Sequence, residues 1–222
     1  MCPATNSLVR VVIADDHPIV RAGLNTLLSA SPSIEIVAEV SDGVQLVRLL
    51  DRMPVDVVIL DLSMPGRDGL ALLRQLRSRA PNVRIVIVSS FEPAIYADRC
   101  LQLGAYAFLD KRTSPEKIVS TVLAAAVSPP RSAPPPASET DEAPHRRLSD
   151  RQYEVFALLV QGVSVTEIAE RLHLSVKTVS THKVAVQQRL GAKSVVDLVK
   201  YAAAHGLIET STVTAPQPDA GE

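Results

Sequence analysis

Asp61 is the residue to which this sequence most readily assigns chemistry. It directly follows the apolar run from Val57 to Leu60, and a run without polar alternation is typical of a strand buried on both faces of a parallel sheet. In open α/β sheets, ligands bind beyond the carboxyl ends of the strands, so a carboxylate here is well placed to react. A single Asp can equally well cap the next turn, so the other strands must decide between the two roles.

Other apolar segments also end at or near side chains that phosphoryl chemistry uses: Asp15 and Asp16 after 9–14, Ser89 after 83–88, and Lys111 after 105–109. The carboxyl ends of parallel strands meet at one edge of a sheet. Three converging carboxylates repel one another unless a cation lies among them, and hard oxygen ligands favour Mg²⁺. The pattern predicts Asp61 as a nucleophile that accepts a phosphoryl group, with Lys111 and Ser89 stabilising the phosphoryl oxygens.

Each of these side chains has a structural alternative. Asp15 can cap a helix that begins near Pro18, Ser89 can satisfy a strand end, and Lys111 can lie in solvent, as most lysines do. Phe108 is by default a core aromatic. The polar groups all fall at the carboxyl ends of strands, and this joint placement favours the chemical role.

The elements that position these residues alternate along the first 127 residues. Strands are predicted over 9–14, 34–40, 55–60, 83–88 and 105–109, each followed by a helical segment. Ser114 and Pro115 mark the start of the last helix, with the hydroxyl as N-cap and proline in the first turn. This alternation predicts a doubly wound α/β fold with a parallel sheet.

The strand ends resemble those of CheY-like receiver domains of two-component response regulators, over residues 8–127. The motifs that carry the resemblance are Ala14-Asp15-Asp16-His17-Pro18, Leu60-Asp61-Leu62-Ser63-Met64-Pro65-Gly66, Asp68-Gly69, Val88-Ser89, Gly104-Ala105 and Leu109-Asp110-Lys111. The resemblance implies a flavodoxin-like, five-stranded sheet of order 2-1-3-4-5.

The same resemblance implies a role for each site residue. Asp61 would be the phosphoacceptor, forming a 4-aspartylphosphate. Asp16 would bind Mg²⁺ directly, Asp15 would hold metal-bound water, and Ser63 would contribute its main-chain carbonyl. Lys111 would remain the cation of the site.

Two further positions match the switch residues of that family. They are Ser89, which supplies the hydroxyl, and Phe108, which stands where Tyr is frequent and therefore lacks a phenol hydroxyl. Ser63 and Phe91 occupy positions that influence hydrolysis of the acyl phosphate. Neither is acidic or an amide, so the lifetime of the phosphorylated state is left open.

The segment from 147 to 208 predicts a second, all-helical domain. Polar caps mark the helix starts: Ser149 with Gln152, Ser164 with Glu167, and Ser175. The first two pairs have the spacing of capping boxes. In the helix over 176–190, one side carries Val179, His182, Val186 and Leu190, and the opposite side carries Lys177, Thr181, Val184 and Gln188, with Ser180 beside them.

Two short helices joined by a tight turn, the second with a polar and basic face, predict a helix-turn-helix over about Val165 to Val184. Its second helix would enter the DNA major groove. The alternative is an ordinary helical bundle with a solvated face. The segment from 145 to 209 is the only net positive part of the chain, which permits contact with a polyanion.

The sequence motifs of these helices resemble the LuxR-type helix-turn-helix of NarL/FixJ response regulators, most closely the RcsB and BvgA branch. The motifs that carry this resemblance are Leu148-Ser149-x-Arg151-Gln152-x-Glu154-Val155, Gly162-x-Ser164-Val165-x-Glu167-Ile168-Ala169 and Ser175-Val176-Lys177-Thr178-Val179-Ser180-Thr181-His182. It implies a four-helix domain with DNA contacts from Lys177, Thr178, Ser180, Thr181, Lys183, Val184 and Gln188. By the resemblance, a last helix over 194–204 would support a homodimer, although its apolar pattern would equally well suit packing within the domain.

Proline crowding over 128–146 indicates a flexible linker between the two domains, and the polar segment 209–222 is predicted to be a disordered tail. The two cysteines have neither metal-ligand spacing nor a disulfide framework, which favours a reducing cytoplasm. No apolar run approaches the length of a membrane span, and no leader is recognisable.

Together these features predict a bacterial response regulator, not a metabolic enzyme. A sensor histidine kinase would phosphorylate Asp61 with Mg²⁺ as cofactor, and the change would control dimerisation, DNA binding and contact with RNA polymerase. One rival is a phosphohydrolase similar to haloacid dehalogenases, but these place a second Asp two residues after the nucleophile, where this chain has Ser63. Another is a DNA-binding or scaffold protein whose receiver domain is not phosphorylated and does not control DNA binding.

Overall fold

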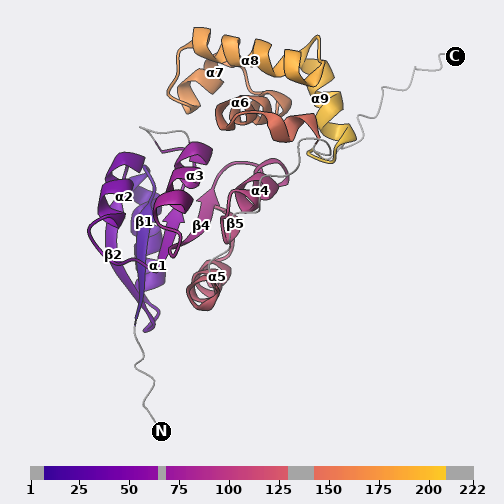
Figure 1. Ribbon diagram of the computed structural model, residues 1–222. Coiled ribbons are helices and arrows are strands. Elements are labelled where there is room, and N and C mark those ends of the chain that lie inside the picture. The colour runs from indigo at the N-terminus through magenta and orange to yellow at the C-terminus, as the bar shows by residue number, and fades with distance from the viewer. Residues whose placement is uncertain (1–7, 65–68, 130–142, 209–222) are drawn as a thin grey trace, which may run out of the picture.

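The computed structural model describes residues 8–64, 69–129 and 143–208, which form two domains in contact with each other (Figure 1). The predictions for Pro65, Gly66 and Asp68, for most of the linker, and for the tail from residue 209 lie outside these residues.

The first domain is built on a parallel sheet of order β2-β1-β3-β4-β5, which confirms the predicted order. Its strands are β1 (Val9–Ala14), β2 (Ile34–Val40), β3 (Val57–Leu60), β4 (Arg84–Ser89) and β5 (Ala107–Asp110). β3 is central, buried along its whole length and paired with β1 and β4. Asp61 therefore follows at the middle of the sheet edge. β4 and β5 end one residue later than predicted, which pairs Ser89 with Asp110.

Helices cover both faces of this sheet, as the fold prediction requires. One face carries α1 (Pro18–Ser29) and α5 (Pro115–Val127), and the other carries α2 (Gly43–Leu50), α3 (Gly69–Arg79) and α4 (Pro93–Gln102). Each face has its own hydrophobic core. Ser114 is the N-cap of α5 as predicted, but its hydroxyl makes no capping hydrogen bond, so Pro115 in the first turn is the remaining start signal.

The second domain is helical. It contains a short 3₁₀ helix η1 (Pro144–Arg147) followed by α6 (Asp150–Val160), α7 (Val165–Arg171), α8 (Val176–Leu190) and α9 (Val195–Ala204). The capping box of Ser149 and Gln152 is confirmed. Ser164 caps α7 by accepting from Glu167 N, but the Glu167 carboxylate pairs with Arg171 Nη2 at 2.5 Å. The second predicted box is therefore only half formed, because an arginine one turn later competes for its carboxylate.

The two domains dock through α6, which packs against α3 and α4 (Figure 1). Tyr153 is buried in this contact, and its hydroxyl donates to the backbone oxygen of Ile95 at 2.7 Å. Glu154 is also buried, and its Oε1 accepts from the backbone N–H of Leu70, near the start of α3, at 3.2 Å. The hydrophobic core of one sheet face continues through this contact into the second domain.

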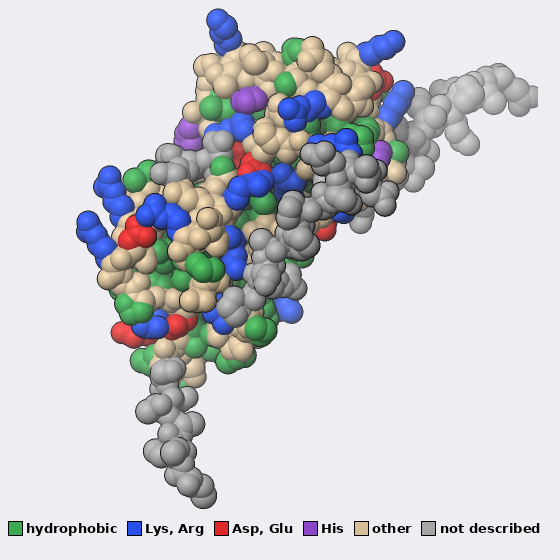
Figure 2. Space-filling model, viewed as in Figure 1, with side chains coloured by type: hydrophobic (Ala, Val, Ile, Leu, Met, Phe, Trp, Pro, Cys, Tyr) green, Lys and Arg blue, Asp and Glu red, His purple; other side chains and the backbone are tan. Residues whose placement is uncertain are grey.

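Hydrogen-bonded ion pairs connect the two domains at the edge of the same contact. The Asp150 carboxylate accepts two hydrogen bonds from Arg74 at 3.0 Å and one from Arg99 at 3.1 Å. Arg99 also donates across the domain boundary to the backbone oxygens of Arg146 and Leu148. Figure 2 shows basic and acidic side chains side by side where the two domains meet. This docking was not predicted from the sequence.

Candidate functional site

The acidic side chains expected at the sheet edge do converge. One ligand atom from each of Asp15, Asp16, His17 and Asp61 lies within 4.8 Å of the others. Asp15 and Asp16 follow β1, and Asp61 follows the neighbouring β3. Asp15 and Asp61 are 2% and 1% exposed, so this negative charge is held in a poorly solvated place. Such carboxylates require a nearby cation.

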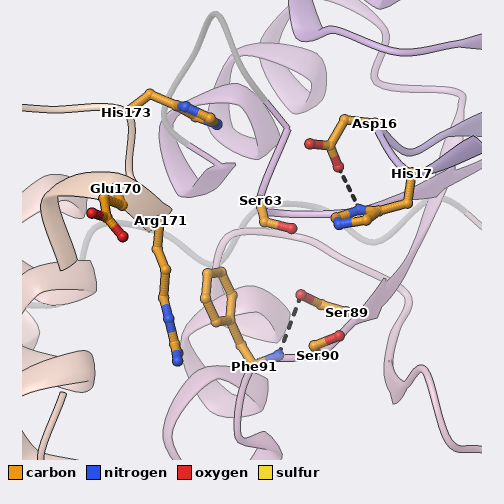
Figure 3. Close-up of a pocket in the computed structure, with 9 residues that line it drawn as sticks. All are labelled: Asp16, His17, Ser63, Ser89, Ser90, Phe91, Glu170, Arg171 and His173. Atoms are coloured by element: carbon orange, nitrogen blue, oxygen red, sulfur yellow. Dashed lines mark hydrogen bonds and ion pairs between the residues drawn. The ribbon is translucent and has the colours of Figure 1, made fainter. Parts of the chain in front are cut away.

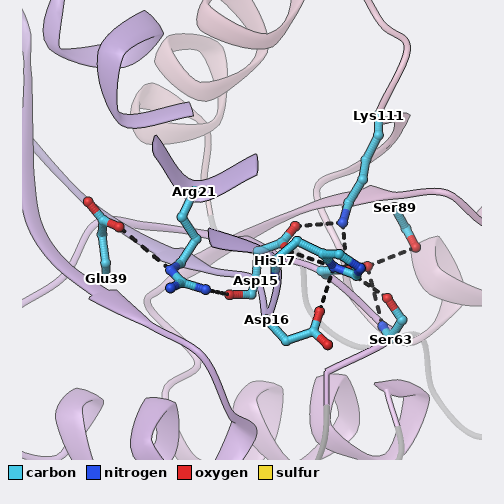
Figure 4. A network of polar contacts seen from close by, with 9 residues as sticks. Asp15, Asp16, His17, Arg21, Glu39, Ser63, Ser89 and Lys111 are labelled. Atoms are coloured by element: carbon cyan, nitrogen blue, oxygen red, sulfur yellow. Dashed lines mark hydrogen bonds and ion pairs between the residues drawn. The ribbon is translucent and has the colours of Figure 1, made fainter. Parts of the chain in front are cut away.

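Lys111 supplies one positive charge to this cluster (Figure 4). Its Nζ lies 2.6 Å from Asp15 Oδ2 and 2.8 Å from Asp61 Oδ2. Burial acts to lower the pKa of Lys111, but the charges and hydrogen bonds of Asp61 and Asp15 outweigh burial and raise the pKa above its ordinary value. The ammonium group therefore stays charged at neutral pH and bridges the two strand ends.

Both oxygens of Asp61 also accept hydrogen bonds from serines. Ser89 Oγ donates to Oδ1 at 3.0 Å, and Ser63 Oγ donates to Oδ2 at 2.7 Å. The backbone N–H of Ser63 lies 3.3 Å from Oδ1. The sequence predicted the Ser89 hydroxyl at this site. For Ser63, the family resemblance implied a main-chain carbonyl ligand and an influence on hydrolysis, but no hydroxyl contact with Asp61. The hydroxyl contact of Ser63 was missed because it depends on the turn that follows β3.

Asp15 makes a local backbone contact and also belongs to the acid cluster, although the N-cap position of α1 is His17. Its Oδ1 accepts from the backbone N–H of His17 at 2.8 Å, which fixes the turn before α1. Its Oδ2, and Oδ1 of Asp16, are buried and accept no hydrogen bond from the described residues, although Lys111 and His17 lie within ion-pair distance. Carboxylate oxygens left in this way suit a hard divalent cation, and the residues present fit Mg²⁺.

Three aromatic side chains lie on or near the β4 and β5 ends of the site. Phe108 is half-buried against the core. The backbone N–H of Phe91 lies 3.4 Å from Ser89 Oγ, and the Phe91 ring stacks on Tyr96 of α4 with centroids 4.6 Å apart. The contact of Tyr96 was not predictable from the sequence, because Tyr96 occupies a helical position that is typical of a core residue.

A cavity of about 550 Å³ lies against the acid cluster (Figure 3). Its lining comes from both domains: Asp16, His17, Ser63, Ser89, Ser90 and Phe91 from the first, and Glu170, Arg171 and His173 from the second. Residues from the helix-turn-helix thus face the site at which the phosphoryl chemistry is expected. The sequence contains no signal for this proximity, because it arises only from the docking of α6.

The α8 helix lies on the side of the second domain away from the sheet (Figure 1). Val179 and Val186 are buried, and His182 and Leu190 are half-buried on the packing side. The residues expected to face outward do so: Lys177, Ser180, Thr181, Val184 and Gln188 are exposed, and Thr178 and Lys183 are half-exposed. Figure 2 shows Lys and Arg side chains projecting from this end of the molecule.

The fold and these two surfaces define a class of protein, a receiver joined to a DNA-binding helical domain. Comparison with known proteins gives the family. The family model described as "Response regulator receiver domain" matches residues 11–123, and the model described as "Bacterial regulatory proteins, luxR family" matches residues 146–202. The chain belongs to the NarL/FixJ-type response regulators of two-component systems, which control transcription.

Individual relatives align with nearly the whole chain. The Fimbriae Z protein of Salmonella typhimurium is 37% identical over 89% of this chain and 98% of its own length. A solved structure of Salmonella typhimurium RcsB, described as showing conformational dynamism for DNA interaction, has a TM-score of 0.65 and 28% identity over 89% of this chain and 98% of RcsB. An RcsB–DNA complex has a TM-score of 0.61 and 31% identity, covering 88% and 98%.

None of the described helices combines the length and the apolar character that crossing a lipid bilayer requires.

Proposed function

We propose that Asp61 accepts a phosphoryl group from a sensor histidine kinase and that this modification controls binding of α8 to DNA. The observation that carries the proposal is the setting of Asp61. It is a buried carboxylate at the end of the central strand, beside two further acids, with Lys111 2.8 Å away and the Ser89 hydroxyl 3.0 Å away. These are the groups that phosphoryl transfer to a carboxylate needs.

In the transfer step, an Asp61 oxygen attacks the phosphorus atom of the donor. The new O–P bond forms while the N–P bond of the phosphohistidine breaks, and the imidazole leaves with the electron pair. Lys111 and the Ser89 hydroxyl are placed to stabilise the phosphoryl oxygens as their charge develops. Ser63, which contacts Asp61 Oδ2, must exchange its hydrogen bond when that oxygen reacts.

Asp15, Asp16, Asp61 and the main-chain carbonyl of Ser63 are the groups that would hold Mg²⁺. When bound, the ion offsets the charge of the carboxylates and of the incoming phosphoryl group. Asp15 Oδ2 and Asp16 Oδ1, which are buried and accept no hydrogen bond from the described residues, support this assignment.

For DNA, the exposed face of α8 supports contact in the major groove. Ser180, Thr181 and Val184 are placed for base edges, and Lys177 and Lys183 for phosphates, with Thr178 and Gln188 beside them. The hydroxyl of Thr178 already bonds Ser175 at 2.8 Å, so its part in DNA contact is secondary. One related structure is described as two RcsB dimers bound to two parallel DNAs, which supports a homodimer here.

The wider function that we propose goes beyond these parts. The chain catalyses its own phosphorylation but is not a metabolic enzyme, acts in the bacterial cytoplasm, and contacts RNA polymerase from the promoter. Phe108 and Ser89 are its switch residues. Ser63, at the place of the second Asp that a phosphohydrolase uses, counts against steady turnover.

Intact mass after incubation with acetyl phosphate tests the acceptor. We expect the mass of one phosphoryl group on the wild type with Mg²⁺, none after removal of Mg²⁺, and none on Asp61→Asn. Asp56→Asn is the matched control, because this Asp precedes the same strand and pairs with Arg10 away from the site. Undiminished labelling of Asp61→Asn would remove the assignment.

A further inference from the structure

An apolar side chain, Val184, lies on the otherwise polar outer face of α8. It is 51% exposed and belongs to neither hydrophobic core of the described residues. Figure 1 shows α8 on the side of its domain that is turned away from the receiver sheet. At an exposed position, valine supports a helix less well than alanine, lysine or glutamine does. Single exposed valines are common on protein surfaces, so the surroundings of Val184 must decide whether it has a function.

These surroundings place Val184 at the centre of the strip that faces DNA in the proposed function. A helix turns by about 100° per residue, so Ser180 lies about 40° to one side of Val184 and Thr181 about 60° to the other. Lys177, about two turns earlier, and Gln188, about one turn later, fall within the same sector. All four neighbours are exposed. A groove floor that contacts both hydroxyls therefore also meets the two methyl groups of Val184.

The charged side chains of α8 limit which bases this strip can read. The helix contains no acidic residue and three basic ones, Lys177, Lys183 and Arg189, which attract the phosphate backbone. Arginine is the commonest reader of guanine, but Arg189 lies in the last turn and donates to the backbone oxygen of Arg147 at 3.0 Å. An acid that could accept from cytosine is absent from this helix. Apart from Lys177, the strip thus lacks the side chains that prefer a G·C pair.

A side chain without donors or acceptors can still read one base directly. Thymine is the one unmodified DNA base that presents a methyl group in the major groove, and apolar contact with that methyl distinguishes it from the other bases. Valine in a helix strongly prefers a single χ1 rotamer. The methyl groups of Val184 are therefore held in place before DNA binds, and little side-chain entropy is lost in the contact.

We propose that Val184 reads the C5 methyl group of a thymine, so that the DNA site carries a T·A pair at the position that Val184 faces. This inference rests on the proposed contact of α8 with the major groove and names the base and the atom that one of its residues recognises. It also predicts that the preference at this position comes from the methyl group itself and not from a hydrogen bond.

Replacement of thymine by uracil tests the contact, because uracil lacks the C5 methyl group and keeps the same hydrogen-bonding groups. A site is first selected from a randomised DNA library with the full-length wild type in BeF₃⁻ and Mg²⁺. Each thymine of this site is then replaced singly by deoxyuridine, and affinities are measured at fixed salt. Val184→Ala removes the contact and keeps a good helix former. Val176→Ala is the matched control, since Val176 is 47% exposed on the same helix but lies about 80° round from Val184.

We expect the wild type to lose about threefold to fivefold in affinity when one particular thymine becomes uracil, as the burial of one methyl group implies. Val184→Ala should bind both bases equally at that position, and Val176→Ala should keep the wild-type ratio. A general loss of affinity cancels in this ratio. The inference is overturned if no replacement weakens the wild type, if Val184→Ala keeps the ratio, or if Val176→Ala loses it. Failure of the wild type to select any sequence would instead overturn the proposed contact of α8 with DNA.

Discussion

The ring of Phe91 is stacked on the ring of Tyr96, with centroids 4.6 Å apart and planes 12° from parallel. On one side, the Phe91 backbone contacts Ser89, whose hydroxyl donates to Asp61. On the other side, Tyr96 meets Tyr153 of α6 edge-on at 6.2 Å. The stack therefore lies between the acid cluster and the DNA-binding domain. Because protein interiors are closely packed, we expect a displacement of Ser89 to disturb the docking surface.

Tyr153→Phe should loosen the docking without removing its ring contacts. Burial raises the pKa of Tyr153 to about 12, so its hydroxyl is a protonated donor at neutral pH, and the bond to the Ile95 oxygen is 2.7 Å long. Its loss should cost about 1 kcal/mol of docking free energy. Hydrogen exchange at the Leu70 amide, which bonds Glu154 across the boundary, measures the effect. Equal protection in Tyr153→Phe and in the control Tyr106→Phe would show that the hydroxyl does not support docking.

Lys111→Ala should uncouple the phosphoryl group on Asp61 from the change in DNA affinity that it normally causes. Among the described residues, only Lys111 places a cation within ion-pair distance of both Asp15 and Asp61. Its removal therefore leaves no lysine to pair with the negative charge of the new phosphoryl group. We expect the DNA affinity of this variant to stay unchanged when the phosphoryl mimic BeF₃⁻ is added with Mg²⁺. The exposed Lys117→Ala is the control and should respond like the wild type. Normal activation of Lys111→Ala would contradict this role.

We expect His145 to make the stability of the second domain depend on pH. Burial is the main cause that lowers its pKa to about 4, and its ring contacts Tyr201 and His205. In the unfolded chain His145 is protonated near pH 6.5, whereas in the folded chain it is protonated only near pH 4. The contribution of His145 to stability is therefore fully present above pH 6.5 and is lost as the pH falls toward 4. Between about pH 7 and pH 5 the loss should be about 2 kcal/mol. Urea denaturation of the wild type and His145→Gln checks this, because an identical pH dependence in both would exclude His145 as the cause.

The convergence of the acids was predictable from the sequence because it depends on topology alone. Parallel strands place their carboxyl ends at one edge, so apolar runs that end at Asp15, Asp61 and Ser89 had to meet. The outer face of α8 was predictable for a similar reason, since helical periodicity decides which side of Thr181 and Val184 faces outward.

The docking surface was not predictable in this way. Tyr153 and Glu154 lie in a helix whose start signals were clear, but nothing local distinguishes a residue buried within its own domain from one buried against another. Asp150 and Arg99 are 51 positions apart and have no pattern in common. Competition between nearby side chains was not predicted either. The Glu167 carboxylate pairs with Arg171 and does not complete the predicted capping box.

Thr181→Ala should change preference among DNA sites more than overall affinity. Thr181 is exposed on the outer face of α8, where its hydroxyl donates to the Lys177 backbone oxygen at 3.0 Å and keeps its lone pairs to accept from a base. Loss of a base contact should cost about 1–3 kcal/mol at the affected base pair. Binding to a randomised site library at fixed salt measures this, with the exposed Thr166→Ala of α7 as the control. A uniform loss across all sequences would indicate a phosphate contact instead.

Control of DNA binding by Asp61 can be measured as the affinity of the full chain for its DNA site, with and without BeF₃⁻ and Mg²⁺. We expect the mimic to tighten binding of the wild type and to leave Asp61→Asn unchanged, because that carboxylate is where the new charge is held. Equal affinity of the wild type in both conditions would show that the receiver does not regulate the DNA-binding domain.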